Sequence, residues 1–484
     1  MEERTFSEEE QRVMSSQFYP KYHLAAPIGW INDPNGFCFF NGRYHMFYQY
    51  HPNSPEWGPM HWGHASSEDL VHWEHEPIAI APDKDYDHGG CFSGSAIEKD
   101  GKLYLLYTGH VPNGDYHHET QCLAISKDGI NFEKFVGNPV LDTPKLDGID
   151  YNDCRDPKIW KHGKKYYCIL GSKTPDQRGQ VLIFKFADLK GWEFMNVSLR
   201  DKEDRRTMYE CPNLAEFDNG AVMILSVIVY RDGFNEYLPQ YSAGKISYRT
   251  GKFKGGDLKM LDYGSSFYAP QIMTTPDGRV IMMGWLNMWN VEMPEQRDGW
   301  AGLMTIPREI ILEGDKVRTV PVKEMEKLRG ESSTYNNLSL TEKSELNGIS
   351  GDVGELLVEV DLKNKPDFAI ELRASDKEKT AGEEENTAGE EEKTALIYNA
   401  DENKLILNRE QSGEGPKDVR EVILEKSGKL KLQIFLDKSS VEIFVNDGEA
   451  VFTSRIYPKE DSQKIFFVPQ KNSLKIDSAT FYQF

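Results

Sequence analysis

The chain has 484 residues and a net charge of −21, from 57 basic and 78 acidic side chains. This balance argues against a nucleic-acid binder and against an anionic membrane surface as partner, since both need clustered Lys and Arg. Hydrophobic residues make up 39% of the sequence with no run of about 18 apolar residues, so we expect a globular protein without a membrane span.

Residues 1–21 are expected to form an N-terminal tail. The segment MEERTFSEEEQRVMSS is acidic and polar and lacks the basic and apolar regions of a signal peptide, so we expect a cytoplasmic protein. Six cysteines stand singly in the first half of the chain, and no two are spaced C-x-x-C. This pattern favours reduced thiols over a zinc site or a disulfide framework.

Five similar segments follow, each a glycine and then a short apolar, aromatic-rich run. They recur at intervals of 57 to 62 residues and begin at Gly42, Gly101, Gly163, Gly220 and Gly278. Each run has the composition of a strand, and helical periodicity is nearly absent between Trp30 and Ile311. Five near-equal all-β units predict a five-bladed β-propeller over residues 22–322. The alternative is a β-sandwich with coincidental spacing.

The repeat ends before residues 323–336, where the charged stretch KEMEKLRG predicts a helical linker. From residue 337 to 484 short alternating segments resume without the 60-residue spacing, which predicts a β-sandwich. Within it, the Glu-rich repeat KTAGEEENTAGEEEKTA predicts an exposed loop. The predicted fold is therefore all-β, a five-bladed β-propeller followed by a C-terminal β-sandwich.

Three acidic residues occupy roughly the same place in three of the repeats. Asp33 in WINDPNG, Asp156 in CRDPKIW and Glu210 in YECPNL each precede a proline by one or two residues. The inner strands of a propeller line its central channel, so we expect the three carboxylates to converge. Converging carboxylates suit a Ca²⁺ or Mg²⁺ site, or glycoside hydrolysis by one ionised and one protonated acid. The aromatic and amide residues around them favour the sugar chemistry.

Six motifs in this order resemble glycoside hydrolase family 32: WINDPNG, CFSGSA, CRDP, ECP, FYAPQ and SSVEIFVNDGEAVFTSRIYP. That family contains β-fructofuranosidases (invertases), sucrose-6-phosphate hydrolases and fructan hydrolases, and its fold is a five-bladed propeller plus a C-terminal sandwich. The resemblance runs from about Tyr22 to Phe484. It implies Asp33 as nucleophile, Glu210 as general acid/base and Asp156 as transition-state stabiliser, with no cofactor and no metal.

The same resemblance implies further substrate contacts, which are Asn32, Gln49, Trp57, Phe92, Ser93, Arg155 and Trp285. The sequence departs from the family pattern at Tyr209, where many bacterial members have Trp, and at Asn213, where many have Asp. The histidine-rich segments at residues 61–75 and 110–118 are interpreted as structural or subsite residues rather than as metal ligands.

We therefore expect a retaining β-fructofuranosidase, a monomer or a homodimer, that acts on a small-molecule sugar such as sucrose. Within the class, hydrolysis of sucrose 6-phosphate or of fructans and fructosyl transfer remain open. From a different class, a non-catalytic carbohydrate-binding protein is the alternative.

Overall fold

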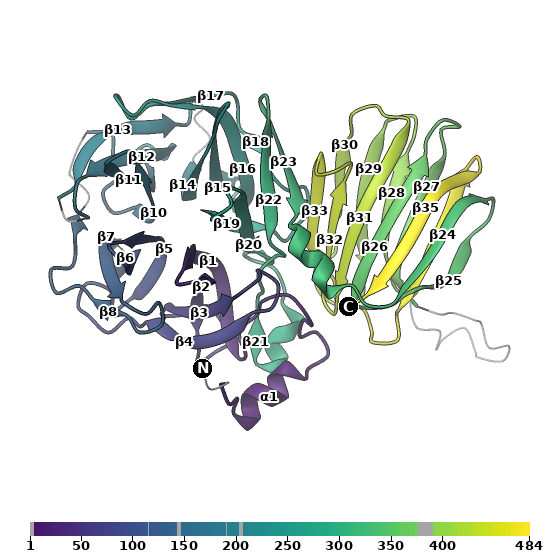
Figure 1. The fold of residues 1–484 in the computed structure, drawn as a ribbon, viewed down its shortest axis with the longest axis horizontal. Coiled ribbons are helices and arrows are strands. Elements are labelled where there is room, and N and C mark those ends of the chain that lie inside the picture. Colours follow the sequence, from purple (N-terminus) through teal and green to yellow (C-terminus); the bar gives the residue numbers. More distant parts are fainter. Residues whose placement is uncertain (1–3, 115, 143–146, 190, 203–206, 376–390) are drawn as a thin grey trace.

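The computed structural model describes residues 4–114, 116–142, 147–189, 191–202, 207–375 and 391–484. Five sheets stand around a common centre, and two six-stranded sheets pack beside them as a sandwich (Figure 1). The predicted all-β fold, a five-bladed β-propeller followed by a C-terminal β-sandwich, is confirmed. No helix in these ranges is long and apolar enough to cross a membrane.

The five blades follow one another along the chain. The first has the order β21 (Trp300–Ala301), β1 (Gly29–Phe40), β2 (Arg43–His51), β3 (His61–Ser67), β4 (Glu74–Ile80). The second has β5 (Gly90–Lys99), β6 (Lys102–Asn113), β7 (Tyr116–Ser126) and β8 (Glu133–Lys134), with β9 (Leu141–Asp142) also on β7. The third has β10 (Cys154–His162), β11 (Lys165–Lys173), β12 (Gly179–Phe186) and β13 (Glu193–Arg200).

The fourth blade has β14 (Thr207–Phe217), β15 (Gly220–Arg231), β16 (Phe234–Ile246) and β17 (Phe253–Gly255), with β18 (Lys259–Met260) also on β16. The fifth has β19 (Tyr268–Thr274), β20 (Val280–Trp285), β22 (Arg308–Glu313) and β23 (Lys316–Pro321), and a 3-10 helix, η1 (Pro294–Asp298), precedes β21. The short strand β21 leaves the fifth repeat and pairs in parallel with β1. This pairing closes the ring, so that β1, β5, β10, β14 and β19 contact one another around the axis.

The sandwich consists of two antiparallel sheets. One has the order β24 (Ser332–Leu340), β35 (Leu474–Gln483), β26 (Gly354–Asp361), β31 (Lys429–Asp437), β32 (Ser440–Val445), β33 (Ala450–Arg455). The other has β25 (Ser344–Ser350), β34 (Lys464–Lys471), β27 (Asp367–Ala374), β28 (Lys393–Asn399), β29 (Lys404–Gln411), β30 (Val419–Ile423). Their facing side chains form one buried apolar core, because alternate residues of each strand point to the same face.

The predicted linker differs from the structure in its second half. Only η2 (Lys323–Leu328) is helical, as a 3-10 helix, and β24 begins at Ser332 rather than after residue 336. Pairing of β24 with the last strand, β35, explains the earlier start, because Ser332 lies opposite Tyr482. The predicted boundaries of the domains stay a prediction. Residues 376–390, which include most of the Glu-rich repeat, lie outside the described residues.

The N-terminal segment packs against the rest of the molecule. It contains α1 (Glu8–Met14), which is capped by Ser7 and Glu10 in a capping box. Beyond the helix, Phe18 and Tyr19 are buried with Trp300 of the propeller and Tyr457 of the sandwich. Because these apolar side chains are buried, residues 4–21 pack on the rest of the molecule instead of forming the expected N-terminal tail. Cys38, Cys91, Cys122, Cys168 and Cys211 are free thiols.

A network of fully buried charges joins the propeller to the sandwich. His23 Nδ1 lies 2.7 Å from Asp437 Oδ2, and His23 Nε2 lies 2.9 Å from Glu442 Oε1. Arg308 pairs with Glu442 on its other side and, at 2.8 Å, with Asp262. Three carboxylates and two cations therefore cross the interface, and each charge has a partner of opposite sign, as buried charges require.

Candidate functional site

All five inner strands break their pairing register at the same height. The breaks lie between Ile31 and Pro34, Phe92 and Gly94, Arg155 and Lys158, Glu210 and Asn213, and Tyr268 and Gln271. Four of these bulges contain a proline, which has no N–H to donate to the neighbouring strand. The bulge of the second blade contains Gly94 instead. A bulge leaves residues unpaired and changes the direction of their side chains. The repeated proline therefore creates a ring of unpaired residues at one end of the propeller axis.

Aligning the strands on the proline shows which residues are equivalent. Asp33, Ser93, Asp156, Cys211 and Ala269 stand directly before it, and one position earlier stand Asn32, Phe92, Arg155, Glu210 and Tyr268. The register expected from the sequence is therefore accurate for Asp33 and Asp156. Glu210 is offset by one residue, because Cys211 separates it from Pro212.

Asp33 is half-buried on β1 and accepts hydrogen bonds at both carboxylate oxygens. The Ser93 hydroxyl donates to Oδ2 at 2.6 Å, and the Asn32 amide donates to Oδ1 at 2.9 Å. Burial raises the pKa of Asp33, and the charge of Glu210 raises it further, while Ser93 and Asn32 act in the opposite direction. The donors therefore stabilise the ionised form of a carboxylate that burial disfavours.

Asp156 is buried on β10 and has a positive φ of 60°, which is rare for a non-glycine residue. Its Oδ2 accepts a hydrogen bond of 2.9 Å from the Cys211 backbone N–H, and its own N–H donates to Thr108 Oγ1 at 3.1 Å. The Cys211 thiol also donates to Asp33 Oδ2 at 3.4 Å, so this residue links the two aspartates. Burial raises the pKa of Asp156, and the charge of Arg155 opposes that shift.

Glu210 on β14 is held at both carboxylate oxygens by neighbouring blades. Arg155 donates to Oε1 through Nη2 at 2.9 Å and through Nε at 3.2 Å. The Tyr268 hydroxyl donates to Oε2 at 2.8 Å. The carboxylate is therefore fixed in orientation by a cation from the third blade and a hydroxyl from the fifth.

The other residues predicted to contact substrate lie at different depths. Phe92 stacks on His110 at 4.2 Å between ring centres, and Trp57, half-exposed, meets Phe92 edge-on at 6.1 Å. Gln49 is buried and donates to the Cys91 carbonyl at 2.9 Å. Trp285 is fully buried, and its ring centre lies 5.8 Å from that of Trp30 and 4.9 Å from that of Trp289.

Two residues that hold the acids, Tyr268 and Cys211, were not among the predicted site residues. Both could have been found from the repeat itself, because each lies in the register of the acids when the four prolines and Gly94 are aligned.

The sequence departs from the family pattern at Tyr209 and Asn213. Tyr209 packs in a buried cluster between the third and fourth blades. Asn213 donates to the Pro270 carbonyl at 2.7 Å, a bond that a carboxylate cannot make.

A second polar ring lies one residue beyond the prolines, formed by Asn35, Ser95, Lys158, Asn213 and Gln271. Asn35 accepts from the Gly94 N–H at 2.9 Å, and Ser95 donates to the Pro157 carbonyl at 2.6 Å. Lys158 crosses the axis to Gln271 Oε1 at 3.2 Å. These bonds link neighbouring and opposite blades directly beneath the acids, so they fix the positions of the inner strands relative to one another.

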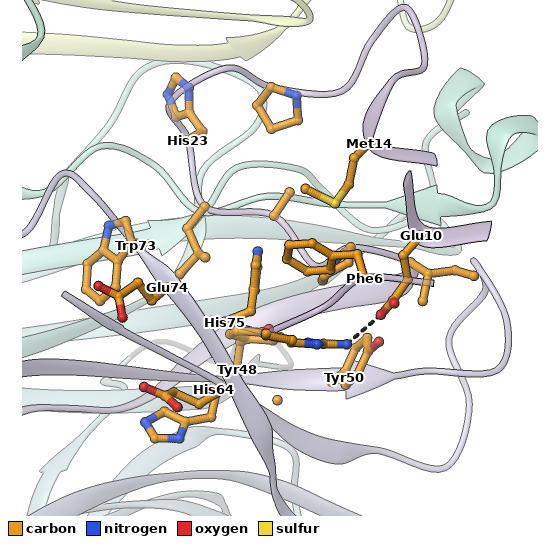
Figure 2. A pocket seen from close by; sticks show the side chains of 18 of the residues that line it. Phe6, Glu10, Met14, His23, Tyr48, Tyr50, His64, Trp73, Glu74 and His75 are labelled. Atoms are coloured by element: carbon orange, nitrogen blue, oxygen red, sulfur yellow. Dashed lines mark hydrogen bonds and ion pairs between the residues drawn. The ribbon is translucent and has the colours of Figure 1, made fainter. Parts of the chain in front are cut away.

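Two hollows lie away from the acids. One of about 1500 Å³ lies between the N-terminal segment and strands β2 to β4, where Phe6, Tyr48, Tyr50, Trp73 and His75 face it (Figure 2). The other, about 1070 Å³, lies between the β15–β16 hairpin and the sandwich strand β30. Its lining includes Tyr237 and Trp289, which also pack on Tyr268 and Trp30 of the acid site.

The chain matches two family models along most of its length. Residues 23–321 match the Glycosyl hydrolases family 32 N-terminal domain, and residues 324–483 match the Glycosyl hydrolases family 32 C terminal. A sucrose-6-phosphate hydrolase from Escherichia coli is 39% identical over 460 residues, which cover 93% of this chain and 91% of that protein. A raffinose invertase from Escherichia coli is also 39% identical, with the same coverage.

Solved structures agree with this match. A GH32 beta-fructofuranosidase from Bombyx mori superposes with a TM-score of 0.82 at 33% identity, covering 98% of both chains. A mutant of that enzyme has been solved in complex with sucrose. The sucrose-6-phosphate hydrolase of Lactobacillus gasseri superposes with a TM-score of 0.83 at 27% identity, covering 98% of this chain and 95% of its own.

Proposed function

The chain belongs to glycosyl hydrolases family 32, and from this premise we propose that it hydrolyses the β-fructofuranosyl bond of sucrose and related β-fructosides with retention of configuration. One observation carries the assignment to this site. Three carboxylates from three blades stand at equivalent bulges and are connected by hydrogen bonds. A pair of acids with different surroundings is what glycoside hydrolysis by double displacement requires.

Asp33 is the proposed nucleophile. Its carboxylate attacks the anomeric carbon of the fructosyl group, and a covalent fructosyl-enzyme forms as the bond to the leaving oxygen breaks. The bonds from Ser93 and Asn32 hold the carboxylate ionised and oriented before the sugar binds. Fixing the nucleophile in this way lowers the entropy cost of reaching the transition state.

Glu210 is the proposed general acid and base. It gives its proton to the departing oxygen in the first step and takes a proton from water in the second, so that water attacks the fructosyl-enzyme. Arg155 and Tyr268 hold the two oxygens of this carboxylate and therefore control where its proton can point. The leaving group departs on this side of the site.

Asp156 is the proposed transition-state stabiliser. Its backbone strain and its bond from the Cys211 N–H hold the carboxylate rigidly, which suits a group that binds sugar hydroxyls as charge develops on the ring. Asn32, Gln49, Trp57, Phe92, Ser93, Arg155 and Trp285 are the proposed substrate contacts. Because Trp285 is fully buried, we propose that it acts through the rings of Trp30 and Trp289, on which it packs.

Sucrose 6-phosphate is the second candidate substrate, favoured by relatives named sucrose-6-phosphate hydrolase that are up to 39% identical. Near Glu210 the side chains of Arg155 and Lys173 carry positive charge, but both already pair with Asp153. The ratio of kcat/KM for sucrose and for sucrose 6-phosphate decides between the two substrates. Inulin in the same assay measures the activity on fructans.

The test is release of glucose and fructose from sucrose by wild type, Asp33→Asn and a matched control, Asp100→Asn. Asp100 is exposed in the turn between β5 and β6, with a positive φ that Asn also adopts readily. We expect Asp33→Asn to lose several orders of magnitude in kcat and Asp100→Asn to match wild type. Correctly folded wild-type protein that releases no sugar from sucrose, sucrose 6-phosphate or inulin would leave the carbohydrate-binding alternative.

A further inference from the structure

A group of histidines and carboxylates lies beside Arg155, outside the proposed catalytic acids. We call it the histidine–carboxylate cluster, and its members are His110, His117, Glu119 and Asp153. His110 on β6 lies directly opposite Glu119 on β7, so both side chains point to the same face of the second blade. His117 is two residues before Glu119 and shares that face, while Asp153 comes directly before β10 of the third blade. Rigid strands therefore bring the four side chains together.

The potential ligand atoms are close enough to share one small ion. One nitrogen of His117 and one oxygen each of Glu119 and Asp153 lie within 4.8 Å of one another. His117 Nε2 is 3.3 Å from Asp153 Oδ1 and 3.8 Å from Glu119 Oε1. His110 Nδ1 is 3.5 Å from the same Glu119 oxygen. His117, Glu119 and Asp153 therefore surround a single point, and His110 stands beside the Glu119 carboxylate.

The two imidazole nitrogens are hidden from solvent and, within the described chain, make no hydrogen bond. Among the described residues, their only polar contacts are the distances to Glu119 and Asp153 given above, which satisfy them incompletely, and an ion that accepts their lone pairs would satisfy them fully. Imidazole nitrogen and carboxylate oxygen are both ligands of Zn²⁺, and three protein ligands with water in the fourth position make a tetrahedral site. Mg²⁺ and Ca²⁺ prefer oxygen ligands alone, so this set favours a late transition metal.

We propose that the histidine–carboxylate cluster is a binding site for Zn²⁺ or a chemically similar divalent transition metal, and that the bound ion inhibits the enzyme. Two cations, Arg155 and Lys173, already pair with the carboxylates of the cluster, so a bound ion has to compete with them. Lys173 lies 3.0 Å from Asp153 Oδ2 and leaves Oδ1 on the side of the histidines.

Inhibition follows from the contacts of Arg155. Its Nη1 lies 2.9 Å from Asp153 Oδ1 and 3.3 Å from Glu119 Oε2, while its Nε and Nη2 hold Glu210. A divalent ion at Asp153 Oδ1 competes with the guanidinium for that oxygen and repels its charge. Arg155 then loses its anchor, and the carboxylate of Glu210 loses the orientation that general acid catalysis needs.

Binding is tested first without any substrate. Calorimetric titration of the metal-free full-length protein with ZnCl₂, and the visible absorption of tetrahedral Co²⁺, are measured for wild type, His117→Ala and His118→Ala. His118 is the matched control, since it is the adjacent histidine and contacts Asp142 instead. We expect one site in wild type and in His118→Ala, and affinity at least about tenfold weaker in His117→Ala. Absence of a site, or equal affinity in all three proteins, would overturn the proposal whether or not sucrose is the substrate.

Inhibition is tested next with whichever β-fructoside the wild type hydrolyses. Zn²⁺ should lower kcat/KM in wild type and in His118→Ala, and EDTA should restore it. In His117→Ala the concentration for half inhibition should rise by the same factor as the dissociation constant. Half inhibition at the same Zn²⁺ concentration in His117→Ala would assign the effect to another group, such as the Cys211 thiol beside Asp33, and would refute the proposed site.

Discussion

Single hydrogen bonds at the acids should influence the pH dependence of the proposed reaction. Burial raises the pKa of Asp33, and the hydroxyl of Ser93 opposes this by donating to the ionised form. A nucleophilic carboxylate works only when ionised, so activity falls as the pH drops through its pKa. The acid side of the pH profile therefore reports on Asp33.

Replacing Ser93 by Ala should raise the pKa of Asp33 further, because one donor to the carboxylate is lost. We expect the acid limb of kcat/KM to move to higher pH, while kcat/KM on the plateau falls by about tenfold, as for loss of one hydrogen bond to a charged group. The measurement is the profile from pH 4 to 9, with Ser339→Ala on the exposed side of the sandwich as control. An acid limb that stays in place would mean that another group controls it.

The bulged inner strand is the element that presents the acids, and the second blade forms it differently from the other four. Prolines interrupt the ladder in four blades, but the second blade relies on Gly94, which lies against the Leu106 carbonyl of β6. A Cβ at this position would come within 2.0 Å of that oxygen. Backbone atoms cannot move aside as a flexible side chain can.

Gly94→Ala should therefore lower the free energy of unfolding by about 1–3 kcal/mol, the usual cost of forcing extra volume into packed structure. Thermal unfolding measures the change, with Gly256→Ala as the control because a Cβ there meets nothing within 4 Å. Ser93 precedes Gly94 and is hydrogen-bonded to Asp33, so activity should fall together with stability. Equal melting temperatures in the two variants would show that β5 shifts to accommodate the methyl group.

At the scale of the whole molecule, the buried charges around His23 connect stability to pH. Burial by itself lowers the pKa of His23, but Asp437 and Glu442 outweigh it and raise the pKa to about 9. A histidine whose pKa is raised on folding stabilises the protein fully below its unfolded pKa of about 6.5. That contribution, about 3 kcal/mol, is lost as the pH rises through 9.

The melting temperature of wild type should accordingly fall between pH 7 and 10. The His23→Gln variant should have a lower melting temperature than wild type at pH 7, because two buried carboxylates each lose a partner. Its melting temperature should fall less than that of wild type as the pH is raised. Scanning calorimetry across that range compares it with His88→Gln, an exposed histidine in a loop of the second blade. Parallel curves for wild type and His23→Gln would contradict the assignment.

Patterns local in the chain were enough to predict the fold class and the number of blades. Alternating strands, Asx-Gly turns and a repeat of about 60 residues depend on neighbours along the sequence, and those neighbours stay together in the fold. A local pattern was also enough to predict the register of Asp33 and Asp156, because the bulge-forming proline directly follows each of them. The sequence by itself therefore determined the architecture and the candidate acids.

Only the tertiary structure decided what surrounds those acids. Tyr268 reaches Glu210 across 58 residues of chain, and Cys211 reaches Asp33 across 178. The burial of Trp285, the packing of residues 4–21 and the charges around His23 likewise depend on segments far apart in sequence. Such contacts arise when blades and sandwich pack together, and no local pattern records them, because the packing of distant surfaces selects which side chains meet.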